Sequence, residues 1–461
     1  MFGVLDEGVK LDWSLTPMQV MRRWPATRRL VMLCSGRYDA RWARYSILAE
    51  PQGDYRFIQN PDGSGQSHWL GSDALVNPTD FHHQPAGDLR TLLASGAGLW
   101  IGYLGYELGQ WFEPTAMHTG PVRAQDDRHW PLIDLACCPG YLVHDAATGF
   151  WTVHGQWSSD WWKQLPELPE NAGSFHSANL RSGFTRARYE QAVAKVIDYI
   201  AAGDIFQANL TQRFTADFTG DYPLAPREAF SRLNTISPAW YGAYIETAPL
   251  NDQPGRVLAS TSPELFLELD SRGNIVTRPI KGTRPASIPA QELIDSEKDT
   301  AELNMIVDLL RNDLGRVCDY GSVQVTQPRT VETHPTIHHG VATIEGRLHP
   351  SRDLVDLLRA ALPGGSITGA PKIRAMQIID ELEPVTRGPY CGSIGYLTHD
   401  SCCLNIAIRT MLLDTANQRV DFSVGGGIVA DSNPAAEYDE TITKARAILE
   451  ALNLAAPAEA S

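Results

Sequence analysis

The chain has 461 residues, a formal net charge of −15 and seven scattered cysteines. This length is sufficient for a large core and for two or three domains. The acidic excess disfavours binding to nucleic acid or to an anionic membrane surface through the general electrostatic field. An anionic ligand would therefore need a local cluster of positive groups.

The cysteines and the N-terminal residues carry information about the compartment. None of the cysteines forms a CxxC pair, so a zinc site is not expected, and their scatter is typical of a reducing environment. The sequence "MFGVLDEGVKLDW" has no basic region followed by an apolar run, and no apolar stretch approaches the about 20 residues of a membrane span. These features predict a cytoplasmic protein.

The first part of the chain, residues 1–165, is rich in short alternating runs such as "ARYSILAEP" and "GLWIGYLGYELG". Such runs, separated by glycine-containing turns, predict strands. The polar segment 164–183, which contains proline and glycine, is the expected connector to the rest of the chain.

The second part mixes helices and strands. Apolar residues at helical spacing predict helices over 185–203, 295–315, 351–362 and 435–454, and a further helix over 371–383 with Pro371 in its first turn. Strands are predicted between them, for example in "IFQANLTQRFTA", "NIVTRPIKG" and "VDFSVGGGIV". The elements do not alternate as regular βαβ units, so the predicted fold class is α+β.

Two helices present acidic residues on one face. Glu437, Glu440 and Lys444 share a face of the last helix, where a solvated surface with an ordinary Glu440–Lys444 pair is one interpretation. Asp299 and Glu302 lie near the start of another helix, where they also complement the helix dipole. If both faces met, their carboxylates would suit Mg²⁺ better than zinc.

Several loops and strands carry groups that suit an anion or proton transfer. In "PGGSITGAPK", backbone N–H groups and Thr368 precede a helix, although the spacing is not that of a P-loop. Arg409 follows an apolar strand and could hold a carboxylate at two points. Glu264 could act as a general acid, and Lys281, between Pro279 and Gly282, as a nucleophile if it is desolvated. An edge-strand carboxylate and a solvated lysine are the ordinary alternatives.

Six strings occur in a fixed order that resembles the chorismate-utilising enzymes. They are "RPIKGTRPA", "DLLRNDLGRV", "PGGSITGAPKIRAMQIIDELE", "RGPYCGSIGYL", "IAIRTM" and "VGGGIVADSNPAAEYDETITKA", and "GDIFQANLTQRF" adds to the match. The resemblance covers about residues 185–452 and is loose before them. It implies an anthranilate synthase component I-like fold, with a large mixed or antiparallel β-sheet sandwich and helices packed outside. It also implies an N-terminal subdomain over 1–165 and a chorismate-binding catalytic domain over 185–455.

Lys281 indicates the branch of the family. The anthranilate branch typically has alanine at this position, whereas the aminodeoxychorismate synthase component I branch has lysine. The resemblance therefore implies that chorismate is aminated to 4-amino-4-deoxychorismate for 4-aminobenzoate and folate synthesis. Lys281 would form a covalent adduct with the ring, and Glu264 would be the general acid.

The resemblance also implies a ligand set and a partner. Mg²⁺ would be held by Glu302 and Glu440, with Glu437 nearby. Ammonia would come from a separate glutamine amidotransferase subunit, since no glutaminase motif is found in this chain. The substrate would be bound by Tyr390, Arg409, Gly426, Gly427, Lys444, Thr368 and His339.

Three alternatives stay open at this stage. Anthranilate synthase component I would release anthranilate from the same substrate. An isochorismate or salicylate synthase would use water instead of ammonia. A non-catalytic subunit would bind chorismate without turning it over.

Overall fold

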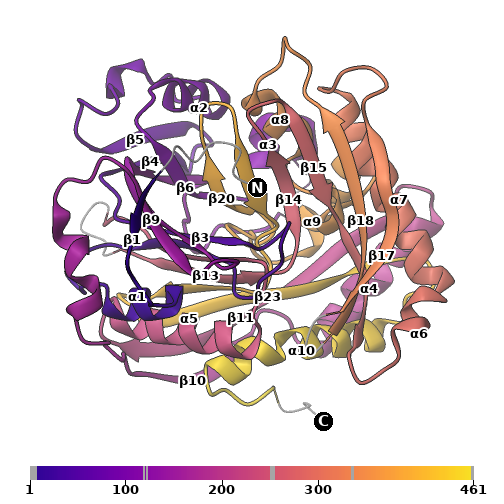
Figure 1. The fold of residues 1–461 in the computed structure, drawn as a ribbon. Coiled ribbons are helices and arrows are strands. Elements are labelled where there is room, and N and C mark those ends of the chain that lie inside the picture. The colour runs from indigo at the N-terminus through magenta and orange to yellow at the C-terminus, as the bar shows by residue number, and fades with distance from the viewer. Residues whose placement is uncertain (1–7, 118–119, 121–122, 250–254, 334–336, 458–461) are drawn as a thin grey trace.

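The computed structural model describes residues 8–117, 120, 123–249, 255–333 and 337–457. Two large sheets dominate this part of the chain, and every paired strand within them runs antiparallel to its neighbour (Figure 1). The predicted α+β class and antiparallel sandwich are confirmed.

The first sheet has twelve strands. In spatial order they are β1 (Val9–Leu11), β9 (Phe150–Gly155), β8 (Gly140–Asp145), β3 (Tyr45–Ala49), β2 (Val31–Cys34), β12 (Tyr241–Glu246), β13 (Val257–Ser262), β22 (Thr410–Asp414), β23 (Arg419–Ile428), β11 (Gln207–Gly220) and β10 (Phe175–Ser182), with β19 (Gly369–Ala370) also paired to β11.

The second sheet has eleven strands. Their order is β16 (Ile280–Pro285), β18 (Ile337–Arg347), β15 (Asn274–Arg278), β14 (Leu265–Leu269), β21 (Cys402–Asn405), β20 (Ser393–Leu397), β6 (Leu99–Leu104), β7 (Ile133–Cys138), β4 (Gly53–Gln59) and β5 (Gly65–Gly71), with β17 (Gln324–Thr333) paired to β18. Both sheets combine strands that are far apart in the sequence: β2 pairs with β12, and β6 lies beside β20 (Figure 1).

The core lies between the sheets and beneath the helices. Residues such as Ile47 from the first sheet and Ile101 and Ile394 from the second form one buried cluster. The outer face of the first sheet is covered by α1 (Pro17–Arg23), α5 (Leu224–Ile236) and α10 (Pro434–Ala451). The second sheet packs against α2 (Pro85–Ala94), α7 (Glu297–Gly315) and α8 (Leu354–Ala361), and α4 (Arg186–Ala201) and α9 (Lys372–Leu382) pack beside β11.

Two local predictions need correction. The expected connector 164–183 includes β10, which pairs with β11 as the last strand on the sheet path, because its side chains alternate between exposed and partly buried positions. Pro371 is the N-cap of α9 and not a residue of its first turn. A proline has no N–H to satisfy, so the cap position suits it as well.

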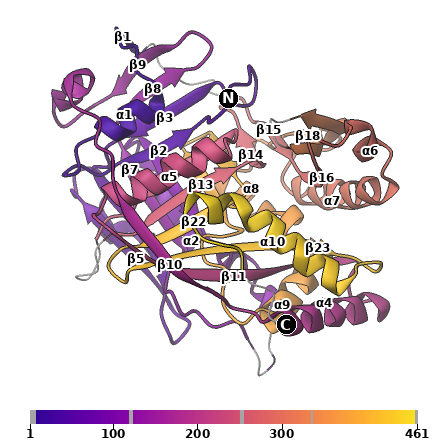
Figure 2. The same ribbon diagram turned by 90° about the horizontal axis from the view of Figure 1, so that it is seen from below.

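The C-terminal helix begins at Pro434, and the Asn433 side chain caps it by accepting a hydrogen bond from the N–H of Ala436. Figure 2 shows β15, β16, β18, α7 and the short α6 (Ala290–Ile294) together at one end of the molecule, beside β23 and α10. This end holds the residues described next.

Candidate active site

Lys281 lies on β16 and reaches toward β23 of the other sheet. Its Nζ is 3.2 Å from the position that a Cβ would take on Gly427, so the glycine makes the close approach possible. The next residue, Gly282, has a φ of +80°, and a Cβ there would lie 2.9 Å from Asp299 Cγ on α7. The two glycines let the lysine strand sit tightly between α7 and β23.

The charge state of Lys281 is set by opposing effects. Burial lowers the pKa of Lys281, the ammonium of Lys444 acts in the same direction, and the carboxylates of Glu302 and Glu264 oppose both. The net effect is a lowered pKa, so a larger fraction of this amine is neutral than in a solvated lysine. A neutral amine is the nucleophilic form.

Glu264 precedes β14 and is 4% exposed. Burial raises the pKa of Glu264 to about 7, although a hydrogen bond from Ser366 and the charge of Lys281 act against the rise. One carboxyl oxygen accepts a 3.4 Å hydrogen bond from the backbone N–H of Ile280, the residue before Lys281. A carboxyl group in this state can donate a proton near neutral pH.

Three charged side chains of α10 surround Gly426. The position of a Cβ on this glycine is 3.4 Å from Glu437 Oε2 and 3.6 Å from both Glu440 Oε1 and Lys444 Nζ. Lys444 forms a 2.6 Å ion pair with Glu440 and donates to the carbonyl of Gly425 at 2.8 Å. Partial burial alone would raise the pKa of Glu440, but Lys444 holds this pKa below its usual range.

Carboxylates from α7 and α10 therefore face the same lysine. Burial raises the pKa of Glu302 and of Glu437, and Ser432 donates a 2.7 Å hydrogen bond to Glu437. Carboxylate oxygens are the donors that Mg²⁺ prefers, so the residue types fit this ion. Among the described residues, however, no three acidic, histidine or cysteine side chains are already gathered closely enough to hold a metal.

Arg409 lies near the buried acid Glu264, and His339 lies beside the strand of Lys281. Arg409 has a φ of +51°, and burial lowers its pKa to about 10 against the opposing charge of Glu264, which places the two groups near each other. His339 on β18 pairs in register with Thr283 on β16, and its Nδ1 lies 2.9 Å from Thr283 Oγ1. The structure thus brings His339 to the Lys281 strand and Arg409 near Glu264.

Thr368 and Tyr390 are both buried. The Thr368 carbonyl accepts a 2.7 Å hydrogen bond from the N–H of Asn209, which pairs with Gly427, but the Thr368 hydroxyl points into its own loop and donates to Gly364 O at 2.9 Å. Tyr390 is buried and follows α9 in the sequence, before β20. The Thr368 hydroxyl is therefore not directed at the lysine.

Gln207 is a site residue that the sequence analysis did not identify. Its side chain is fully buried, and its Nε2 lies 2.3 Å from the Cβ position of Gly427, beside Lys281. Within the described part of the chain, neither amide atom has a hydrogen-bond partner. The available signal was its place at the start of the strand in "GDIFQANLTQRF", a string that was matched without assigning roles.

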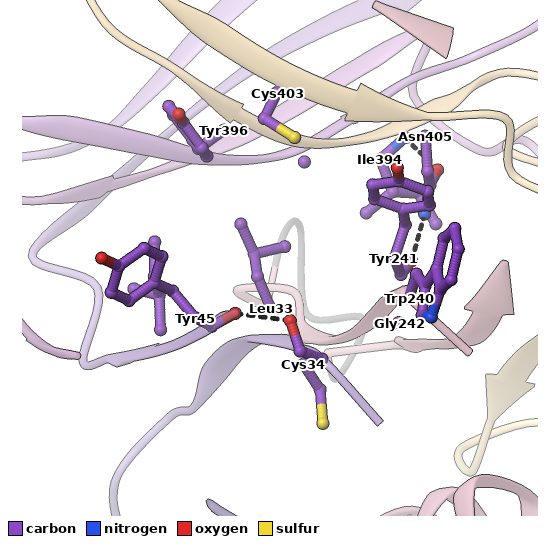
Figure 3. Close-up of a pocket in the computed structure, with 13 residues that line it drawn as sticks. Leu33, Cys34, Tyr45, Trp240, Tyr241, Gly242, Ile394, Tyr396, Cys403 and Asn405 are labelled. Carbon is purple, nitrogen blue, oxygen red and sulfur yellow. Dashed lines mark hydrogen bonds between the residues drawn. The ribbon is translucent and has the colours of Figure 1, made fainter. Parts of the chain in front are cut away.

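A separate hollow lies between the two sheets (Figure 3). Leu33, Cys34 and Tyr45 line one side, and Tyr396 and Cys403 line the other. None of its lining residues is charged, and none is a predicted site residue. All seven cysteines of the chain are free and buried.

Comparisons with known proteins identify the family of the chain. The family of chorismate binding enzymes matches residues 35–450. The chain is 42% identical over 384 residues to aminodeoxychorismate synthase component 1 of Salmonella typhimurium, which covers 81% of this chain and 79% of that one. It is 41% identical over 480 residues to anthranilate synthase component 1 of Pseudomonas aeruginosa, covering 95% and 93%.

A solved structure of a related protein has a similar fold. The crystal structure of anthranilate synthase component I from Streptococcus pneumoniae superposes with a TM-score of 0.70 at 29% identity, over 96% of this chain and 100% of that one. The chain has the anthranilate synthase component I-like fold, as its sequence predicted. It belongs to the chorismate-binding enzyme family.

No helix in the described residues is long and apolar enough to cross a membrane.

Proposed function

We propose that this chain is an aminodeoxychorismate synthase component I, which converts chorismate and ammonia into 4-amino-4-deoxychorismate. The observation that carries the proposal is the position of Lys281, a lysine of lowered pKa held beside Gly427 and facing the acidic residues of two helices. The Salmonella typhimurium relative, whose name states this activity, supports the same assignment.

The residues suit a displacement in two stages. The neutral Nζ of Lys281 would form a bond to C2 of the ring while the ring double bonds shift and the C4 hydroxyl leaves. Glu264 would supply the proton that makes this hydroxyl leave as water. Ammonia would then bond to C4, the double bonds would shift back, and the lysine would leave C2. Two easier displacements replace one difficult step.

Mg²⁺ would be held by Glu302 and Glu440, with Glu437 nearby. When bound, the ion would neutralise and fix a carboxylate of the substrate. The chain's own cations would hold the remaining negative charge: Lys444 lies at the edge of the glycine strand, and Arg409 lies near Glu264. The glycines of β23 and Tyr390 would lie at the substrate's carboxylates, and Thr368 and His339 would line its ring.

The ammonia source would be a separate glutamine amidotransferase subunit. The word "component" in the names of the relatives supports such an assembly. We expect the purified chain to accept ammonium salts alone and to use glutamine only when that subunit is added.

Anthranilate synthase component I is the second candidate. It is favoured by the near-complete coverage of the Pseudomonas aeruginosa relative. The two activities differ in product, because anthranilate is fluorescent and is released together with pyruvate, whereas 4-amino-4-deoxychorismate keeps its enolpyruvyl group.

The decisive experiment is mass spectrometry of the protein after incubation with chorismate and Mg²⁺ without ammonia. We expect a ring-sized mass on the peptide that contains Lys281, and its loss in Lys281→Ala. Lys195→Ala, which removes an exposed lysine on α4, is the matched control. The absence of a mass on that peptide, together with release of anthranilate in a parallel incubation that contains ammonium, would assign the chain to the second candidate.

A further inference from the structure

Arg387 is a buried arginine just after α9 that none of the proposed chemistry uses. Its guanidinium forms an ion pair with Glu383, with hydrogen bonds of 2.6 and 2.9 Å. The same group also donates to two backbone carbonyls, that of Ile367 at 2.9 Å and that of Asn209 at 2.6 Å. One side chain therefore connects three separate segments of the chain.

The two carbonyls belong to walls of the proposed chorismate site. Ile367 precedes Thr368, and the carbonyl of Thr368 accepts a hydrogen bond from the N–H of Asn209. Asn209 pairs in register with Gly427 on β23. The guanidinium of Arg387 thus fixes the 364–368 loop relative to β11, the neighbour of the strand that carries the glycines.

Glu383 extends this connection along the same strand. Its Oε1 accepts 2.9 Å hydrogen bonds from both the N–H and the hydroxyl of Thr211. Thr211 pairs with Gly425. The carbonyl of Gly425 accepts a hydrogen bond from the ammonium group of Lys444. The ion pair therefore reaches both ends of the glycine run.

The backbone of Arg387 is held from the N-terminal part of the chain. The two carboxyl oxygens of Glu107 each accept one backbone hydrogen bond, from the N–H of Arg387 at 2.7 Å and from the N–H of Gly388 at 2.9 Å. Tyr106 donates its N–H to the carbonyl of Gly388, and the guanidinium lies 4.5 Å from the centroid of its ring. Both residues come from "GYLGYELG", a string to which the sequence analysis assigned no role.

A buried ion pair of this kind is weak evidence for stability, because the cost of desolvating both charges offsets much of their attraction. Its geometric effect is stronger, since a planar guanidinium fixes the directions of several acceptors at once. We propose that Arg387 is a positioning residue of the chorismate site, and that Glu107 holds Arg387 in place from the N-terminal part. This inference rests on the proposed function for its substrate.

The test compares Arg387→Lys with Arg227→Lys. Arg227 is an equally buried arginine on α5 that pairs with Glu246 and donates to the carbonyls of Trp24 and Arg28, away from the site. Both substitutions keep the positive charge and remove the planar guanidinium with its several donors. A general loss of stability should therefore affect both variants. Glu107→Gln is the second variant, because an amide offers one acceptor oxygen where the backbone requires two.

For Arg387→Lys we expect the KM for chorismate to rise about tenfold or more, with an unchanged pH profile of kcat, since Lys281 lies on another strand. We expect Glu107→Gln to raise the KM about threefold, and Arg227→Lys to leave it within about twofold. Equal KM values in Arg387→Lys and Arg227→Lys would overturn the proposal.

Amide hydrogen exchange provides a measurement that needs no substrate. We expect faster exchange in the peptides that contain Thr368 and Asn209 for Arg387→Lys and for Glu107→Gln, but not for Arg227→Lys. Unchanged exchange in Glu107→Gln would overturn the proposal even if Arg387→Lys failed to fold. If the unmodified protein made no 4-amino-4-deoxychorismate, the proposed function would fail, and hydrogen exchange alone would then decide the positioning role.

Discussion

Lys281 Nζ lies 3.2 Å from the point where a Cβ on Gly427 would stand, so the reactive amine and the glycine strand occupy adjoining space across two different sheets. The same point is 2.3 Å from Gln207 Nε2. No room is left for even one methyl group between the three residues, because the glutamine is fully buried. The lack of a side chain at Gly427 is therefore as important for the shape of the site as the side chains of Lys281 and Gln207.

Gly427→Ala should therefore damage the reaction more than the fold. The added methyl group must displace Gln207 or Lys281, and a misplacement of this size at a reacting group costs about a hundredfold in kcat/KM. The measurement is chorismate consumption with ammonium and Mg²⁺. Gly87→Ala on α2, where the nearest atom would be 4.0 Å away, is the control and should keep full activity. Equal rates in the two variants would contradict this account.

Glu264→Gln should make the protein more stable at alkaline pH while abolishing most of its activity. The pKa of Glu264 is raised from 4.5 to about 7 in the native state, so the fold favours the protonated carboxyl. This contribution is fully present below pH 4.5 and is lost as the pH rises through 7. At pH 8 the variant should gain up to about 3 kcal/mol in free energy of unfolding.

The measurement for Glu264 is urea unfolding of both proteins at pH 4.5 and pH 8, without Mg²⁺ or chorismate. The gain should be near zero at the lower pH, since both side chains are then uncharged. A constant difference between the two pH values would show that this carboxyl does not titrate as described.

Glu440→Gln should weaken the proposed magnesium site. Removing one charged oxygen donor should raise the Mg²⁺ concentration for half-maximal activity about tenfold or more. Mg²⁺ titration at saturating chorismate measures this, and calorimetry of Mg²⁺ binding provides a readout without turnover. Glu450→Gln, an exposed position on the same helix, is the control and should change neither value.

Arg409→Lys should raise the KM for chorismate. A lysine cannot make the two-point contact with a carboxylate that a guanidinium makes, and the loss of a charged hydrogen bond costs about 2 kcal/mol, or roughly thirtyfold in affinity. The exposed Arg359 of α8, changed to lysine, should leave the KM unaltered. An unchanged KM in Arg409→Lys would remove this residue from the substrate contacts.

Local patterns predicted much of the second half of the chain. Helices α4, α7, α8, α9 and α10 lie close to the ranges predicted from apolar residues at helical spacing. Helix α5 was not predicted, although it packs on the first sheet. Short-range patterns also could not show that β2 pairs with β12, because strand partners far apart in sequence are selected by tertiary packing.

The candidate site was likewise only partly predictable from local sequence patterns. The acidic face of α10 could be recognised from spacing, but that spacing fits a solvated surface equally well. Only the three-dimensional arrangement places Glu440 beside Gly426 and turns the Thr368 hydroxyl away from the lysine. Gln207 was overlooked because a strand glutamine has no local signal of function, and its importance comes from burial without a partner in the described structure.

The interleaved sheets have a consequence for synthesis on the ribosome. Strands β2 and β6 emerge long before their neighbours β12 and β20, so the growing chain carries open sheet edges for much of its translation. Exposed edges of this kind invite pairing with other chains. We expect the nascent protein to need protection by chaperones until its last strands have been made, and a gene cut between the two halves to yield aggregates and not two folded products.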